Sequence, residues 1–116
     1  MSSCIFCKIV HGDLPSIKVF EDKDILVFKD IKPAAPVHVL VIPKEHFASL
    51  SDAQDKHAKL LGKMLLKIRD LAKQLNVHKT GYKIVINNGE GSGQIVFHLH
   101  IHLIGGWKKE AVGYKI

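Results

Sequence analysis

His98-Leu99-His100-Ile101-His102-Leu103-Ile104 is the stretch that decides the fold of this chain of 116 residues. Histidines alternate in it with aliphatic residues, and successive side chains of a β-strand point to opposite faces. The pattern therefore predicts a strand over 96–104 that turns three imidazoles to one face and its aliphatic residues to a hydrophobic core. A chance run on a solvated face is a poor explanation for three histidines at this spacing. We expect a functional site on this face.

Segments before residue 96 show the sequence patterns of four further strands. Short stretches of branched and apolar residues bounded by polar turns are typical of strands. His38 is the one polar residue in the apolar stretch 37–42, and that interruption needs an explanation. The prolines of Lys32-Pro33-Ala34-Ala35-Pro36 lack backbone donors, so this segment is expected to be a shaped loop. The predicted strands are 18–21, 25–30, 37–42, 83–87 and 96–104.

Two helices are expected beside the sheet. Apolar residues recur at helical spacing over 51–76, which predicts one long helix with Ser51 and Gln54 as its capping box. A shorter helix is predicted at the N-terminus, where Ser3 caps an apolar stripe that runs to about residue 11.

The composition indicates a single domain over residues 1–116, with 47% hydrophobic and 24% charged residues. The net charge of +6 would attract phosphate metabolites, nucleic acid or an acidic membrane surface. Scattered lysines, a single arginine and few aromatic residues argue against a dedicated nucleic-acid groove. No apolar run approaches the roughly 20 residues that cross a membrane, and the N-terminus lacks a signal-peptide pattern. We therefore expect a cytoplasmic protein without a membrane partner.

The residues alone leave two functions open for the histidine strand. Alternating histidines can converge on a metal ion with a carboxylate ligand, although no acidic residue close in sequence suggests itself. Alternatively, an imidazole with a pKa of about 6.5 is largely neutral at pH 7 and can attack phosphorus without a separate base. The glycine-rich loop over 88–93 favours phosphate, because its backbone amides can approach an anion closely. Asn87, Ser92 and Gln94 add side-chain donors.

The histidine run resembles the histidine triad family, and two further motifs share the resemblance over nearly the whole chain. They are Phe28-Lys29-Asp30-Ile31-Lys32-Pro33-Ala34-Ala35-Pro36-Val37-His38 and Ile42-Pro43-Lys44. The branch resembled is the histidine triad nucleotide-binding group. The resemblance implies an α+β fold in which an antiparallel sheet of about five strands packs with one short N-terminal helix and one long helix. It also implies a homodimer that pairs its sheets. It also implies a purine nucleoside phosphoramidase-like hydrolase, which cleaves nucleoside 5′-phosphoramidates or related adenylated substrates through a nucleotidyl-histidine intermediate.

The resemblance also implies roles for single residues. His100 would attack the α phosphorus, His102 would hold phosphate oxygens, and His38 would help to fix the tautomer of the nucleophile. Asp30 would bind the ribose hydroxyls and Ile31 would pack on the purine base of an AMP or GMP derivative. From the residues alone, His38 could equally be a satisfied core histidine and Asp30 a turn residue. The remaining residues implied in nucleotide binding are Asn87, Gly93, Gln94 and Ile95.

Ile95 departs from the family pattern, because close relatives often carry a serine there that donates to the departing group. Isoleucine has no donor and cannot protonate an amine. Preference for the leaving group is therefore open. Two alternative functions stay beside the phosphoramidase: a dinucleoside polyphosphate hydrolase with the same intermediate, and a nucleotide-binding regulatory module with little catalytic activity.

Cys4-Ile5-Phe6-Cys7 has the two-residue spacing that lets both thiolates reach one zinc ion. A pair of buried thiols without a metal is an alternative. A redox pair is a further one, although no strand precedes Cys4 as it would in a thioredoxin-like unit. The resemblance to zinc-bearing members of the family implies that His46 and His98 complete a structural Zn²⁺ site. His98 would then bind zinc and would not bind phosphate.

Overall fold

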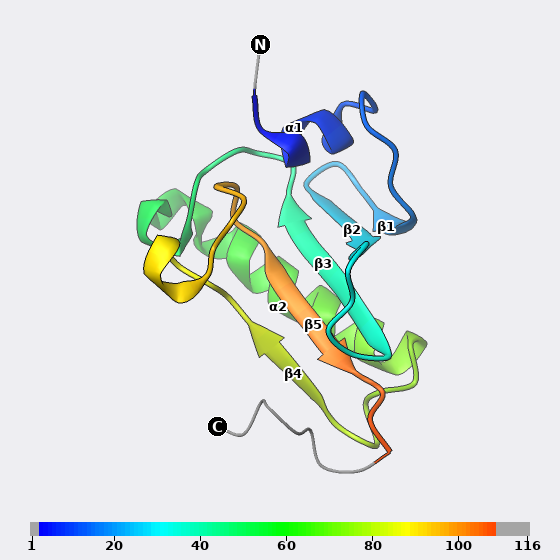
Figure 1. Cartoon of the computed structure of the whole chain (residues 1–116). Helices are drawn as coiled ribbons and strands as arrows, with labels where there is room; N and C mark the ends of the chain where they lie inside the picture. The colour runs from blue at the N-terminus through cyan, green and yellow to red at the C-terminus, as the bar shows by residue number, and fades with distance from the viewer. Residues whose placement is uncertain (1–2, 109–116) are drawn as a thin grey trace.

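The histidine run leads into β5 (Ile101–Gly105), which lies between β3 (Val37–Pro43) and β4 (Tyr82–Val85) in the sheet (Figure 1). A hairpin of β1 (Lys18–Glu21) and β2 (Ile25–Lys29) extends the sheet beyond β3. The strand order is β1-β2-β3-β5-β4, and all neighbours are antiparallel. The computed structural model describes residues 3–108 of the chain.

Two helices flank this sheet, α1 (Ile5–Val10) and α2 (Ala58–Gln74). The 17-residue α2 crosses the face of the sheet that points away from the viewer in Figure 1. The prediction of an α+β fold with an antiparallel five-stranded sheet, a short N-terminal helix and one long helix is confirmed. Within residues 3–108, no helix combines the length and the apolar character that crossing a membrane requires.

Alternation along the strands divides the apolar side chains between two cores. Val27, Val39 and Val41 belong to the core that contains the buried residues of α2, as do Leu99, Ile101 and Leu103. The neighbours of the valines in β2 and β3 point the other way and pack around Phe6 of α1; they are Leu26, Phe28, Leu40 and Ile42. The imidazoles that alternate with Leu99, Ile101 and Leu103 therefore share the α1 face.

The predicted strand over 96–104 is longer than the observed β5, and proline explains the difference. The ladder between β3 and β5 pairs Val41 with Ile101, and its continuation would pair Ile42 with His100 and Pro43 with Leu99. Proline has no N–H to donate, and the ladder stops. The N–H of Leu99 donates instead to the carbonyl of Phe47 at 2.8 Å. His98 and His100 consequently lie in an irregular segment, whereas His102 lies in β5.

The long helix begins seven residues later than 51, the predicted start, because two short 3₁₀ turns precede it. Gln54 is extended, with φ −110° and ψ 167°, so a helix cannot run through it. The capping box therefore joins Gln54 to His57, and the predicted box of Ser51 and Gln54 is wrong. At the other end, Asn76 adopts a left-handed φ of 59°, which asparagine tolerates better than most residues. The cap of α1 is Cys4 rather than Ser3.

Candidate active site

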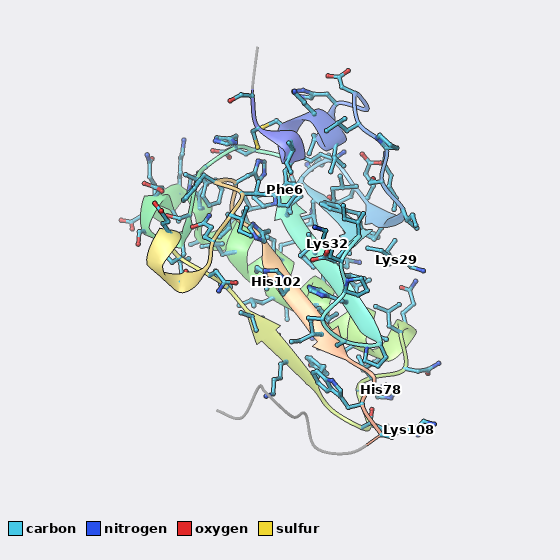
Figure 2. All side chains as sticks on the ribbon, in the orientation of Figure 1. Phe6, Lys29, Lys32, His78, His102 and Lys108 are labelled. Atoms are coloured by element: carbon cyan, nitrogen blue, oxygen red, sulfur yellow. The ribbon has the colours of Figure 1, made fainter. Side chains whose placement is uncertain are left out.

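A cavity of about 660 Å³ opens on the α1 face of the sheet. This volume suits a small organic ligand. Figure 2 shows Phe6, Lys32 and His102 on this side of the sheet, contributed by α1, by the loop after β2 and by β5. The apolar lining comprises Ile5, Phe6, Ile9, Leu14, Pro15, Phe28, Ile31, Leu40, Ile95 and Val96. The polar lining includes Asp30, Asn87, His100 and His102. A ligand with one apolar and one anionic or polar part would match these walls.

His100 is held in one tautomer by a single hydrogen bond. Its Nδ1 lies 2.7 Å from the carbonyl oxygen of His98, which can only accept, so Nδ1 carries the proton. Nε2 then holds the free lone pair. The ring of Phe6 packs edge-on against the imidazole, with centroids 5.1 Å apart and planes at 84°. Burial lowers the pKa of His100, and its hydrogen bond to His98 opposes this only in part. The result is a neutral, oriented imidazole in the cavity wall.

His102 is set in the complementary tautomer by His38. The N–H of Ala34 donates to Nδ1 of His38 at 2.9 Å, so the proton of His38 must sit on Nε2. That Nε2 lies 2.9 Å from Nδ1 of His102 and donates to it. The proton of His102 is then on Nε2, where it can donate to an anion. Burial lowers the pKa of His102 to about 4, with smaller contributions from His100 and His38. His38 thus fixes the tautomer of His102, whereas the predicted role concerned the nucleophile.

Asp30 is a turn residue that also lines the cavity. Its Oδ1 accepts from the N–H of Lys32 at 2.8 Å, which is the geometry of a turn residue. Its Oδ2 lies 3.3 Å from Nε2 of His38, and the residue lines the cavity. The carboxylate is therefore positioned by its own turn and retains acceptor capacity for a ligand. The neighbouring Ile31 is 91% exposed and also lines the cavity, which is an unusual place for a bare aliphatic side chain.

The loop before the histidine segment is organised by Gln94. Its Nε2 donates to the carbonyl of Ala48 at 2.7 Å and to that of Val96 at 3.1 Å, and its Oε1 accepts from the N–H of Gly89 at 2.8 Å. Gln94 is 4% exposed. Both amide protons are thus committed within the protein, so we assign Gln94 to shaping the loop. The predicted contact of Gln94 with phosphate finds no support in this geometry.

Other residues of the loop do reach the cavity. Asn87, Gly93 and Ile95 line it, as expected from the sequence. Asn87 donates from Nδ2 to the carbonyl of Ser92 at 2.7 Å. Gly93 has a φ of 95°, a backbone conformation that side chains rarely adopt. Ile95 is 86% exposed.

Four side chains from three parts of the chain converge beside this cavity, and their donor atoms all lie within 4.8 Å of one another; they are Cys4, Cys7, His46 and His98. The two Nδ1 atoms are 3.1 Å apart, and the sulfur-to-nitrogen distances given by the contacts are 3.3, 3.5 and 3.6 Å. Ligands at zinc distances of about 2.0–2.3 Å in a tetrahedron lie about 3.3–3.8 Å apart. The residues present therefore fit a zinc ion.

The tautomer of His98 supports a zinc ion at these four residues, whereas the tautomer of His38 argues against a metal ion at a second group of side chains. Nε2 of His98 donates to the carbonyl of Pro43 at 2.7 Å, which leaves its Nδ1 unprotonated and available to a metal. Asp30, His38 and His102 also form a compact group. There, however, the facing atom of His38 is Nε2, which must keep its proton because Nδ1 accepts from Ala34. A metal would have to displace that proton.

The sequence interpretation missed the contribution of the N-terminal helix to the cavity. Ile5 and Phe6 stand between the two cysteines, and both line the cavity together with Ile9. The signal was present in the sequence: if the cysteines and His98 share one metal, the residues between the cysteines must lie next to the histidine segment. Lys29 and Lys32, on either side of Asp30 and Ile31, also line the cavity and were missed.

Comparisons with known proteins agree with this geometry. The family model described as "Scavenger mRNA decapping enzyme C-term binding" matches residues 3–113. The chain is 52% identical over 105 residues to Protein HitA of Neisseria gonorrhoeae, a match that covers 90% of this chain and 97% of that protein. It is 45% identical over 107 residues to Adenylylsulfatase HINT1 of Arabidopsis thaliana, which covers 90% of this chain and 72% of the relative.

Two solved structures share the fold at clear sequence identity. A HIT family hydrolase from Legionella pneumophila Philadelphia 1 superposes with a TM-score of 0.89 at 45% identity, covering 91% of this chain and 95% of the other. A zinc-bound histidine triad family protein from Mycobacterium smegmatis gives a TM-score of 0.82 at 34% identity, covering 97% and 81%.

Proposed function

Because the chain belongs to the histidine triad family, we propose that it is a nucleotide-binding hydrolase or transferase that cleaves nucleoside 5′-phosphoramidates or related adenylated substrates at the α phosphorus. The substrate is a purine nucleotide derivative of AMP or GMP. The observation that carries this proposal is the pair of locked tautomers, in which His100 offers a lone pair and His102 offers an N–H within one cavity.

The nucleotide binds across the cavity with its sugar at Asp30. The carboxylate accepts hydrogen bonds from the ribose hydroxyls, while Ile31 and the apolar wall from α1 contact the base. The exposure of Ile31 supports this, because a bound base would cover an aliphatic side chain that is otherwise 91% exposed. The α-phosphate then lies against the imidazoles.

The reaction follows from the two tautomers. Nε2 of His100 attacks the α phosphorus, the bond to the leaving group breaks, and a nucleotidyl-histidine forms that water then hydrolyses. Nε2–H of His102 donates to a phosphate oxygen throughout, which stabilises the charge that develops there. His38 holds His102 in the donating tautomer. The Arabidopsis relative is named an adenylylsulfatase, which supports an adenylylated substrate.

Turnover by His100 variants tests this function. We expect His100→Ala to lose at least about a thousandfold in kcat for AMP derivatives, since a missing nucleophile cannot be replaced by the cavity alone. His78→Ala is the matched control, because His78 lies far from the cavity (Figure 2) and is exposed. Equal turnover by both variants would refute the nucleophile. Nucleotide binding without turnover in the wild type would favour the regulatory module.

We also propose that Cys4, Cys7, His46 and His98 hold a structural Zn²⁺ ion. The ion would tie α1 to the segment that precedes β5. The convergence of four donor atoms and the zinc-bound relative from Mycobacterium smegmatis support this. Metal analysis of protein prepared without chelator should find about one zinc per chain, and less than about 0.1 would contradict the site.

A further inference from the structure

The identity of the leaving group depends on a proton, and this step rests on the proposed function. When Nε2 of His100 bonds to the α phosphorus, the electron pair of the broken bond departs with the leaving group. An oxygen of a sulfate, carboxylate or phosphate carries that pair as a stable anion. The nitrogen of a phosphoramidate does not, so it must receive a proton as the bond breaks. The cavity wall beside the α-phosphate therefore determines which bonds can be cleaved.

The side-chain donors of the loop beside the imidazoles do not offer a proton to a leaving group, as far as residues 3–108 show. Gln94 gives both amide protons to the carbonyls of Ala48 and Val96. The hydroxyl of Ser92 donates to the carbonyl of Gly89 at 2.7 Å. Asn87 donates to the carbonyl of Ser92, and an amide N–H is in any case far too weak an acid to protonate an amine.

Ile95 forms a further part of the cavity wall. Its side chain is 86% exposed, follows the loop directly and lines the cavity together with Gly93 and Asn87. It presents only methyl and methylene groups, so nothing at this position can donate a proton. A departing group would meet apolar surface here.

The other polar groups of the wall do not replace this donor. His38 donates to Nδ1 of His102 and burial lowers the pKa of this ring, so the ring is neutral and its Nε2–H donates a hydrogen bond without releasing the proton to an amine. Lys29 and Lys32 flank Asp30, on the sugar side of the cavity. Ser16 lines the cavity with a buried hydroxyl that has no hydrogen-bond partner, but it belongs to the segment between α1 and β1 and not to the loop beside the imidazoles.

We propose that this chain cleaves mixed anhydrides of nucleoside monophosphates, whose leaving group departs as a sulfate, carboxylate or phosphate anion, in preference to phosphoramidates. The attack by His100 breaks a P–O bond and releases the oxyanion without proton transfer. Water then cleaves the P–N bond to His100, which returns the imidazole and the nucleoside monophosphate. Ile95 is a specificity-determining residue for this reaction.

The experiment follows the covalent intermediate with two substrates of the same nucleotide. Adenylyl sulfate and adenosine 5′-phosphoramidate give the same adenylyl-enzyme, so its hydrolysis rate is shared. With the anhydride we expect rapid formation and accumulation of the adenylyl-enzyme in quenched samples. With the phosphoramidate, formation limits turnover and the adenylyl-enzyme stays sparse.

Two variants at position 95 complete the design. Ile95→Ser introduces a hydroxyl that can hydrogen-bond the departing nitrogen and relay a proton to it from water, and it should raise kcat/KM for the phosphoramidate at least about tenfold. The anhydride step needs no donor, so the ratio of kcat/KM for the phosphoramidate to kcat/KM for adenylyl sulfate should rise. Ile95→Val alters the wall without adding a donor and should keep the wild-type ratio of the two rates.

The outcomes separate the two proposals. Equal accumulation with both substrates, and an unchanged ratio in Ile95→Ser, would overturn the preference for anhydrides while the nucleophile stands. No adenylyl-enzyme with either substrate would overturn the proposed function itself.

Discussion

The hydrogen bonds of His100 and His102 fix opposite tautomers in two imidazoles that occupy equivalent places in the alternating sequence pattern. Alternation predicted that both share a face, and the cores confirm that their neighbours point the other way. Which ring attacks cannot be read from alternation, because it depends on the proton positions. These are set by the carbonyl of His98 and by the N–H of Ala34, and both contacts require the folded chain.

The pH dependence of stability should report the buried state of His102. The unfolded ring takes up a proton near its ordinary pKa of 6.5, whereas the folded ring does so only at about 4. The stability from this difference is complete above pH 6.5 and is lost as the pH falls towards 4. Urea unfolding at pH 7.5, 6.5, 5.5 and 4.5, with zinc in excess, should show a shallower decline for His102→Gln than for the wild type. Parallel curves would contradict the assignment.

Gln94 should matter for the loop rather than for chemistry. Gln94→Glu removes the two donors while it keeps size and shape, and it leaves the carbonyls of Ala48 and Val96 without their partner. We expect the free energy of unfolding to fall by about 2 kcal/mol or more. Exposed Gln74→Glu in α2 is the matched control. A variant at Gln94 with wild-type stability would show that these hydrogen bonds do not hold the loop.

At the scale of elements, α1 links the proposed zinc site to the nucleotide cavity. Ile5 and Phe6 lie between two ligands and line the cavity, so loss of the metal should also loosen the apolar wall. We expect zinc removal to weaken AMP binding about tenfold, equivalent to about 1.4 kcal/mol of lost contact. Calorimetric titration of zinc-loaded and chelated protein measures this.

The double variant Cys4→Ser/Cys7→Ser serves as the control for that experiment. It should bind AMP as weakly as the chelated wild type and should not respond to chelator. An affinity for AMP that is independent of zinc in the wild type would show that α1 keeps its place without the metal.

The elements themselves were largely predictable, because each owes its existence to a local pattern. Alternation located the strands and helical spacing located α2. The ends were less predictable, since they depend on partners: β5 shortens because Pro43 would face Leu99, and α2 starts late because Gln54 is extended. The apolar wall from α1 could be inferred only after the cysteines were joined to His98.

For the whole molecule, the sheet ends at β4, whose outer edge has no partner strand among residues 3–108. An unpaired edge is a template for pairing with a second copy, and Ile84 of β4 is 43% exposed. We propose that two chains form a homodimer through this edge. Light scattering should then give twice the chain mass of 12.9 kDa.

A charged substitution at this edge tests the dimer. Ile84→Asp should shift the protein towards the monomer, because a carboxylate would be buried where the two sheet edges meet. Ile17→Asp, an equally drastic change beside β1 at the opposite edge, should leave the mass unchanged. A monomeric wild type would overturn the proposal.

The central claim is that His100 is the nucleophile, and the covalent intermediate tests it most directly. Protein quenched in acid-free denaturant during turnover of adenylyl sulfate should gain the mass of one AMP moiety, and peptide mapping should place it on His100. His78→Ala should gain the same mass. An adduct on His102 or on any other residue, or turnover of adenylyl sulfate by His100→Ala at the wild-type rate, would contradict the account.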